Sequence, residues 1–155
     1  PSEPLEGVHQ GPSHAVTATL VDENDPAQAK QNVLDLLASG NVPDCIVALY
    51  GYSGPAVVEA LAEAGHADDV VVIGFDYDDE TVRAIEDGRM YASIAQDPYN
   101  YGFHAVRILA EELDDSSYGS IPINNIIDIR CLTLRAANLA EFKAELEKRR
   151  SGVRG

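Results

Sequence analysis

Short apolar runs alternate along the chain with longer segments in which apolar residues recur every three or four positions. The short runs predict β-strands, and the longer segments predict amphipathic helices. Strands that are apolar on both faces and alternate with helices are typical of a parallel sheet covered on two sides. The sequence therefore predicts an α/β fold with three layers. The predicted strands are VTATLVD (16–22), DCIVALY (44–50), VVVIGF (70–75) and YASIAQ (91–96).

Residue types that favour helix ends mark the boundaries of the predicted helices. Asp25 and Asp97 each stand directly before a proline, which places a capping carboxylate ahead of a residue that suits the first helical turn. Asp78 or Asp79 is in position to cap a shorter helix. Glycine tolerates the left-handed backbone that ends many helices. The glycines at which we expect helices to end are Gly40, Gly65 and Gly88.

The last third of the chain predicts a helix, at least one strand and a second helix. The strand falls within 123–134, and Asn138 caps the last helix, which carries Leu139, Phe142 and Leu146. The helix after Asp97 has a continuous apolar stripe at spacings of three and four. Its members are Tyr99, Phe103, Val106, Leu109, Ala110 and Leu113.

Loop-forming residues divide the chain into four parts. Residues 1–14 carry three prolines and two glycines and predict a flexible arm. Residues 15–96 form the main α/β unit. Residues 97–150 supply the helix, strand and helix described above, and residues 151–155 predict a frayed tail.

Charge removes two classes of partner from consideration. The 155-residue chain has 11 basic and 26 acidic residues, a formal net charge of −15. Such a field repels phosphate backbones and anionic lipids, so we expect no nucleic acid and no membrane surface as a partner. Cys45 and Cys131 lie in apolar runs, which favours two buried thiols and leaves a disulfide open.

The ends of the chain suggest an origin in a larger protein. No stretch approaches about 18 consecutive apolar residues, and no basic-then-apolar start marks a signal peptide. The chain begins at Pro1 and not at Met. We therefore expect a processed chain or an excised piece.

The carboxyl ends of the predicted strands hold the candidate chemistry, because ligands of open parallel sheets bind there. These ends are polar, acidic and aromatic, and they contain no lysine or arginine. The glycines at 51 and 54 lack the pattern of a phosphate loop, and the histidines do not have the compact spacing of a metal site. We therefore predict no cofactor and no metal.

A serine nucleophile is one alternative. The stretch 51–55, GYSGP, lies between a strand and a helix, as the G-x-S-x-G elbow of α/β hydrolases does. Asp76 and His104 follow in the chain order of a triad. Proline, however, replaces the second glycine, and His104 falls within a helix on its polar side. We favour a helix-capping Ser53, a solvated His104 and no enzymatic activity, with a small α/β hydrolase as the alternative.

Sugar recognition fits the strand ends better. Asp76 can accept two hydroxyl hydrogen bonds, and Gln96 can both donate and accept. Aromatic side chains offer flat faces to the C–H side of a sugar ring. The predicted ligand-binding residues are Asp76, Gln96, Tyr50, Tyr52 and either Phe75 or Tyr77.

The stretch VVVIGFDYDDETVRAIEDGRMYASIAQDPYNYGFHAV (70–106) resembles the ribose-type periplasmic sugar-binding proteins of ABC importers. The resemblance implies a type I periplasmic-binding-protein lobe in which Asp76 and Gln96 bind sugar hydroxyls. Tyr50 stands where many members have asparagine, so either Tyr50 stacks on the ring or Tyr52 and Ser53 take over the contact.

The resemblance covers only the second half of that family, whose ligand is clamped between two lobes. It implies that residues 97–150 pack on the other lobe, or exchange between two copies in a homodimer. It also implies a sugar ligand, a membrane permease as partner and a periplasmic location. The effector-sensing domain of LacI-type regulators shares the fold and is a further alternative.

Overall fold

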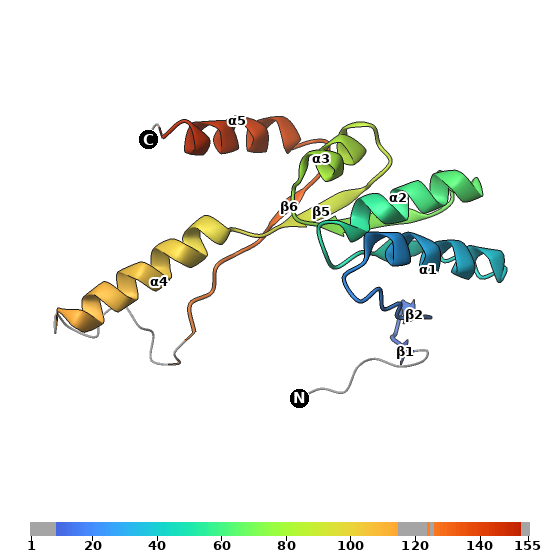
Figure 1. Ribbon diagram of the computed structural model, residues 1–155, viewed down its shortest axis with the longest axis horizontal. Helices are drawn as coiled ribbons and strands as arrows, with labels where there is room; N and C mark the ends of the chain where they lie inside the picture. The colour runs from blue at the N-terminus through green and yellow to red at the C-terminus, as the bar shows by residue number, and fades with distance from the viewer. Residues whose placement is uncertain (1–8, 115–123, 125, 153–155) are drawn as a thin grey trace.

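The protein is built around a four-stranded sheet. The computed structural model describes residues 9–114, 124 and 126–152. The strands lie in the order β3 (Cys45–Val47), β4 (Val71–Phe75), β5 (Ala92–Ala95) and β6 (Leu132–Leu134) (Figure 1). The first three are parallel, and β6 runs antiparallel to β5. The predicted α/β class with a mainly parallel sheet is confirmed.

Five helices accompany the sheet in the described part of the chain. Three of them begin at capping carboxylates as predicted, whereas Asn138 occupies the N-cap position of α5 without a side-chain capping hydrogen bond. The carboxylates of Asp25, Asp78 and Asp97 each accept a hydrogen bond from a backbone N–H in the first turn. Gly40, Gly65 and Gly88 have φ angles of 80°, 77° and 75°, the left-handed region expected after a helix. The helices are α1 (Pro26–Ala38), α2 (Ser53–Ala64), α3 (Asp79–Glu86), α4 (Pro98–Leu113) and α5 (Leu139–Arg150).

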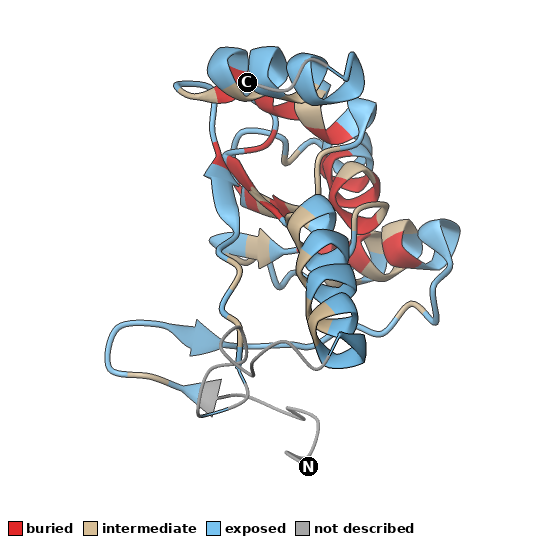
Figure 2. Ribbon diagram, turned by 90° about the vertical axis from the view of Figure 1, so that its left-hand side faces the viewer, coloured by how far each residue is buried: buried red, intermediate tan, exposed pale blue. Residues whose placement is uncertain are grey.

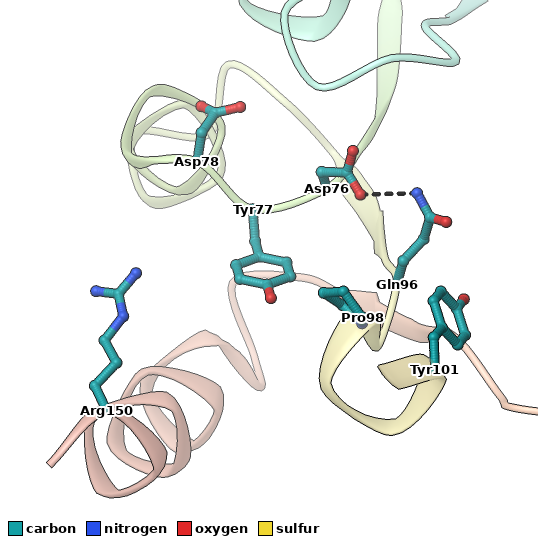
Figure 3. A pocket seen from close by; sticks show the side chains of 7 residues that line it. All are labelled: Asp76, Tyr77, Asp78, Gln96, Pro98, Tyr101 and Arg150. Carbon is teal, nitrogen blue, oxygen red and sulfur yellow. Dashed lines mark hydrogen bonds between the residues drawn. The ribbon is translucent and has the colours of Figure 1, made fainter. Parts of the chain in front are cut away.

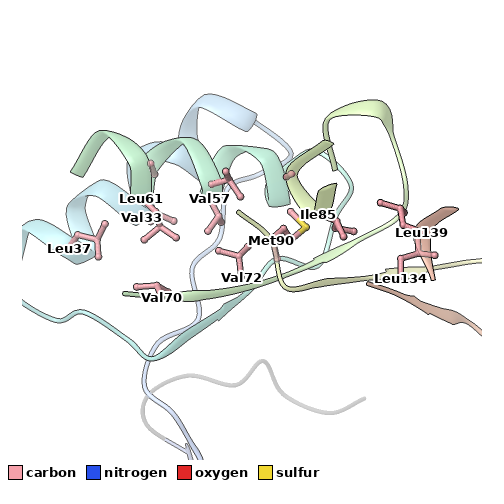
Figure 4. Close-up of a cluster of buried hydrophobic side chains, with 14 of the residues drawn as sticks. Val33, Leu37, Val57, Leu61, Val70, Val72, Ile85, Met90, Leu134 and Leu139 are labelled. Carbon is pink, nitrogen blue, oxygen red and sulfur yellow. The ribbon is translucent and has the colours of Figure 1, made fainter. Parts of the chain in front are cut away.

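The hydrophobic core lies between the helices and one face of the sheet (Figures 2 and 4). Strand residues reach it from alternate positions, so Val70 and Val72 point toward α1 and α2. Leu134 of β6 and Leu139 of α5 extend the core beyond β5. The labelled members are Val33, Leu37, Val57, Leu61, Val70, Val72, Ile85, Met90, Leu134 and Leu139.

The opposite face of the sheet is partly open to solvent. Val47 and Val71, which point away from the core, are 53% and 44% exposed. Of the three layers expected, the described residues thus supply the sheet and the helices on one face. Cys45 shares this open face, and both Cys45 and Cys131 are free and exposed, so the expectation of buried thiols is wrong.

Helix α4 projects away from the sheet (Figure 1). None of its residues is buried. The predicted stripe forms, but five of its side chains leave between 50% and 88% of their surface exposed. They are Tyr99, Phe103, Val106, Leu109 and Leu113, and we call them the α4 stripe.

One predicted strand differs from the structure. Of 16–22, only Val16 is in a strand: β2 (Ala15–Val16) pairs antiparallel with β1 (His9–Gln10). The strand predicted within 123–134 forms as β6, whereas residues 126–131 are not in a strand. Apolar alternation favours extended backbone, but a strand forms only where a partner edge is available. Residues 115–123, before β6, and the end of the predicted tail lie outside the described residues.

Matched leucines test the contrast between the core and the α4 stripe. Leu61 is 1% exposed and Leu113 is 88% exposed. We expect Leu61→Ala to lower the free energy of unfolding by about 2–5 kcal/mol, because it leaves a cavity in the core. Leu113→Ala should change it by less than about 0.5 kcal/mol. Urea denaturation followed by circular dichroism measures both, and equal effects would contradict the described packing.

Candidate functional site

A carboxylate and an amide meet where two neighbouring parallel strands end. Asp76 directly follows β4, and Gln96 directly follows β5. The register pairs Phe75 with Ile94, so both side chains emerge at the same edge of the sheet. The Gln96 Nε2 donates a hydrogen bond of 3.0 Å to Asp76 Oδ1. The structure therefore brings together the two residues that the sequence analysis ranked first for ligand binding.

The backbone of Asp76 is unusual and is held from both sides by β5. Its φ angle is 64°, the left-handed region that non-glycine residues seldom adopt. Its N–H donates to the Ile94 carbonyl at 2.9 Å. Its own carbonyl accepts a hydrogen bond of 2.7 Å from the Ser93 hydroxyl. This conformation turns the chain at the end of β4 and directs the carboxylate toward Gln96.

An open hollow of about 500 Å³ adjoins the Asp76–Gln96 pair (Figure 3). It lies where the ends of β4 and β5 meet the first turns of α3 and α4 and the last turn of α5. Arg150 of α5 is the basic residue of the lining. The lining residues are Asp76, Tyr77, Asp78, Gln96, Pro98, Tyr101 and Arg150.

Asp78 has a structural task within this lining. Its Oδ1 accepts hydrogen bonds from the backbone N–H groups of Glu80 and Thr81, at 3.0 and 2.9 Å. Its Oδ2 lies 3.3 Å from the Thr81 hydroxyl. The carboxylate of Asp78 is therefore used to begin α3, whereas Asp76 Oδ2 has no protein hydrogen bond within the described ranges.

The turn after β3 approaches Asp76 but directs its side chains elsewhere. A Cβ added at Gly51 would lie 3.5 Å from the Asp76 carboxylate, so this turn borders the pair. Tyr50 is exposed, and its ring stacks on Tyr52 with centroids 5.8 Å apart. The Tyr52 hydroxyl donates to Asp22 Oδ1 at 2.9 Å. Neither tyrosine lines the hollow.

The contact with Asp22 changes the acidity of Tyr52. Partial desolvation of the phenol raises its pKa, and the hydrogen bond to Asp22 and the negative charge of this carboxylate raise it further. Asp22 was not predicted as a site residue. The sequence signal that could have identified it is its place at the end of an apolar run, beside the turn-forming residues Glu23 and Asn24.

Ser53 is neither a helix cap nor part of a triad. The N-cap position of α2 is Tyr52, and no side chain caps it, so the predicted capping role of Ser53 is wrong. Ser53 is buried, and its hydroxyl lies 3.5 Å from Asp22 Oδ2. His104 lies on α4 and is half-buried, and its buried Nδ1 has no hydrogen-bond partner within the described residues.

Of the two aromatic alternatives at the end of β4, Tyr77 lines the hollow and Phe75 does not. Phe75 is half-buried on β4 and points to the open face of the sheet, because side chains alternate along a strand. Tyr77 follows the turn at Asp76, and its ring packs edge-on against Phe142 at 5.1 Å. The alternation of side chains along a strand predicts the face to which Phe75 points. It does not apply to Tyr77, which follows the left-handed turn at Asp76.

Tyr101 and Arg150 were also not foreseen as lining residues. Tyr101 lies on the first turns of α4. Desolvation of its phenol is the main cause that raises its pKa, and the neighbouring Cys131 thiol raises it further. Arg150 ends α5, directly before the tail that the sequence predicts to be frayed. Both reach the hollow through the packing of distant segments, for which the local sequence gives no signal.

The described residues offer no sign of a metal site or of a membrane span. No group of three or more His, Cys, Asp or Glu side chains in the described ranges is arranged to hold a metal ion. No described helix has the length and apolar character needed to cross a bilayer.

Known families and solved structures show what the chain is similar to. The family model described as the periplasmic binding protein domain matches residues 5–117. No protein in a search of curated sequences matches the chain. Among solved structures, an ABC transporter solute-binding protein from Agrobacterium vitis with bound D-fucose is similar, with a TM-score of 0.71 and 22% identity. The match covers 83% of this chain and 43% of that one.

Two further structures show the same fold. GanP, a glucose-galactose binding protein from Geobacillus stearothermophilus, has a TM-score of 0.68 and 20% identity over 76% of this chain and 40% of its own. An ABC transporter solute-binding protein from Bacillus halodurans with bound myo-inositol has a TM-score of 0.64 and 21% identity over 78% and 40%. The chain thus spans less than half the length of each of these proteins.

A pH titration tests the Tyr52–Asp22 contact. The raised pKa means that the folded state holds the phenolic proton more tightly than the unfolded chain does. The free energy of unfolding should therefore fall as the pH rises past the ordinary tyrosine value of about 10. Denaturation between pH 8 and 11 should show a smaller fall in Tyr52→Phe than in the wild type. Tyr50→Phe is the control, because its hydroxyl does not contact Asp22, and equal slopes for wild type and Tyr52→Phe would refute the contact.

Proposed function

Because this chain belongs to the periplasmic binding protein domain family, we propose that it is part of the solute-binding component of an ABC import system and that it binds a sugar or a similar polyol. The observation that carries the proposal is the Asp76–Gln96 pair beside the hollow. The proposed site lies at the carboxyl edge of the sheet, where open parallel sheets bind ligands.

The chemistry of the pair suits a polyol. With Oδ1 of Asp76 held by Gln96, Oδ2 is available to accept a charge-assisted hydrogen bond from a ligand hydroxyl. The Gln96 amide keeps a carbonyl oxygen that can accept another. Tyr77 and Tyr101 in the lining offer flat apolar surfaces to ring C–H groups. D-fucose and myo-inositol, bound in two similar structures, are neutral polyols, which supports the same ligand class here.

We propose that the hollow is one side of a crevice whose other side belongs to a second lobe. The chain spans 40–43% of the similar structures reported above. The α4 stripe is an apolar surface with no cover in the described residues, and it begins beside the hollow at Tyr99. Ligand would bridge both lobes and shift the balance from an open to a closed form. A membrane permease would then recognise the closed form on the outer side of the cytoplasmic membrane.

For the chain on its own, we propose that a second copy supplies the missing cover by exchange of residues 97–150. Each copy carries an exposed apolar helix face and a partly open sheet face. An exchange of these segments would bury the apolar area of both copies, and the burial of apolar area is the main driving force of association.

Substitution of Asp76 tests ligand recognition. Asp76→Asn keeps the size of the side chain, and asparagine tolerates the left-handed backbone, so the fold should be retained. We expect ligand affinity to fall at least about tenfold, because a charge-assisted hydrogen bond contributes about 1.5–3 kcal/mol. Isothermal titration of the full-length protein with D-fucose, D-allose, D-galactose and myo-inositol measures the loss.

The matched control makes the same chemical change outside the hollow. Asp68→Asn alters an exposed turn residue that has no part in the lining, so it should bind as the wild type does. An affinity for Asp76→Asn equal to that of the control would refute the role of Asp76.

Sedimentation velocity tests the proposed association of the chain. We expect the 155-residue chain to sediment as a dimer at micromolar concentration and Leu109→Glu to sediment as a monomer, because a charge in the α4 stripe would have to be desolvated. Arg107→Glu, on the polar side of α4, should leave the dimer intact. A wild-type chain that is monomeric at all concentrations would contradict the exchange.

A further inference from the structure

We propose that Ser93 is a positioning residue for ligand binding: its buried hydroxyl holds the backbone of Asp76 in the left-handed conformation that aims the carboxylate into the hollow. The inference rests on the proposed function of the Asp76–Gln96 pair and extends it to a residue that no ligand would touch. Ser93 is in the middle of β5 and does not line the hollow.

The burial of Ser93 is the first observation. Its relative exposure is 0%, and its side chain lies on the face of the sheet that carries the core. A buried hydroxyl costs free energy unless it is hydrogen-bonded, so a polar residue at this place needs a partner. The partner that the structure gives it is the Asp76 carbonyl, at 2.7 Å.

The conformation of Asp76 is the second observation. A φ of 64° is unfavourable for a residue with a side chain and persists only where the surroundings impose it. Two hydrogen bonds from β5 fix the two polar backbone groups of Asp76. The Ile94 carbonyl accepts from its N–H, and the Ser93 hydroxyl donates to its carbonyl. Without the second bond, the peptide plane after Asp76 is free to turn.

Glycine at position 74 makes room for this contact. Gly74 lies opposite Ser93 in the β4–β5 register. A Cβ added there would lie 2.9 Å from Met90 Sδ and 3.6 Å from the Ser93 hydroxyl. A side chain at 74 would therefore clash with Met90, which is fully buried, and would crowd the hydroxyl. Gly74, Asp76 and Ser93 thus act together, with the glycine providing space, the serine the hydrogen bond and the aspartate the ligand contact.

The orientation of the Asp76 carboxylate depends on the same peptide. In the structure, Oδ1 of Asp76 is 3.0 Å from Gln96 Nε2, and both residues line the hollow. Rotation of the Asp76 backbone would carry the carboxylate away from Gln96 and out of line with a ligand hydroxyl. Loss of the Ser93 hydroxyl should therefore weaken ligand binding even though Ser93 does not line the hollow.

Three variants separate positioning from general stability. Ser93→Ala removes the hydroxyl and leaves a small residue that fits a buried strand. Ser93→Thr keeps the hydroxyl and suits a strand, so it is the rescue variant. Ile85→Val trims a core residue that is 1% exposed and does not line the hollow, so it lowers stability without changing the lining. The sugar is the member of the panel above that the wild-type full-length protein binds most tightly.

We expect Ser93→Ala to weaken sugar binding by about threefold to tenfold, the equivalent of one neutral hydrogen bond. Ser93→Thr and Ile85→Val should bind within about twofold of the wild type. In ligand-free samples of the full-length protein, hydrogen exchange followed by NMR should show faster exchange of the Asp76 amide in Ser93→Ala than in Ile85→Val. Ser93→Cys has a weaker hydrogen-bond donor of similar size, so its sugar affinity and Asp76 amide exchange should lie between those of the wild type and Ser93→Ala. It replaces Ser93→Ala in both measurements if Ser93→Ala does not fold.

The two measurements, sugar affinity and Asp76 amide exchange, distinguish failure of this inference from failure of the proposed function. Affinity and Asp76 amide exchange in Ser93→Ala that equal those in Ile85→Val would overturn the positioning role, even if Asp76→Asn abolishes binding. If the wild type binds no sugar of the panel, the proposed sugar-binding function fails. The exchange of the Asp76 amide then still decides whether Ser93 holds this backbone.

Discussion

The parallel pairing of β4 with β5 is the constraint on which the rest of the site depends. Its register places Gly74 opposite Ser93 and Phe75 opposite Ile94, so both strands end at one edge. There β5 fixes the backbone of Asp76 through two hydrogen bonds and presents Gln96 to its carboxylate. A shift of one residue in this register would move every side chain to the other face and separate the pair.

Two exposed apolar surfaces have one physical explanation. The α4 stripe and the open face of the sheet are both made of residues that a folded protein normally buries, because apolar area in water is unfavourable. The chain also spans less than half of the similar solute-binding proteins. These two apolar surfaces are the ones that the proposed second lobe or second copy would cover.

The site divides into residues that a ligand could reach and residues that hold them. Asp76, Gln96, Tyr77 and Tyr101 face the hollow, whereas Asp78 begins α3. The aromatic turn after β3 was predicted to contact ligand, but Tyr52 and Ser53 turn toward Asp22 instead. A carboxylate that ends one apolar segment attracts the hydroxyls of the next, and the sequence does not reveal which pairs will meet.

The sequence by itself determined the alternation of helices and strands after residue 25, the helix starts at Asp25 and Asp97, and the strand ends that carry Asp76 and Gln96. These features depend on local chemistry, because caps, proline and glycine act within one turn of the backbone. Only the tertiary structure decided that residues 17–22 stay outside a strand, that the α4 stripe remains uncovered, that Asp78 and not Asp79 caps α3, and that Tyr77 and not Phe75 lines the hollow. Each of these outcomes requires contact between distant segments, and whether a partner surface is present cannot be read from apolar periodicity alone.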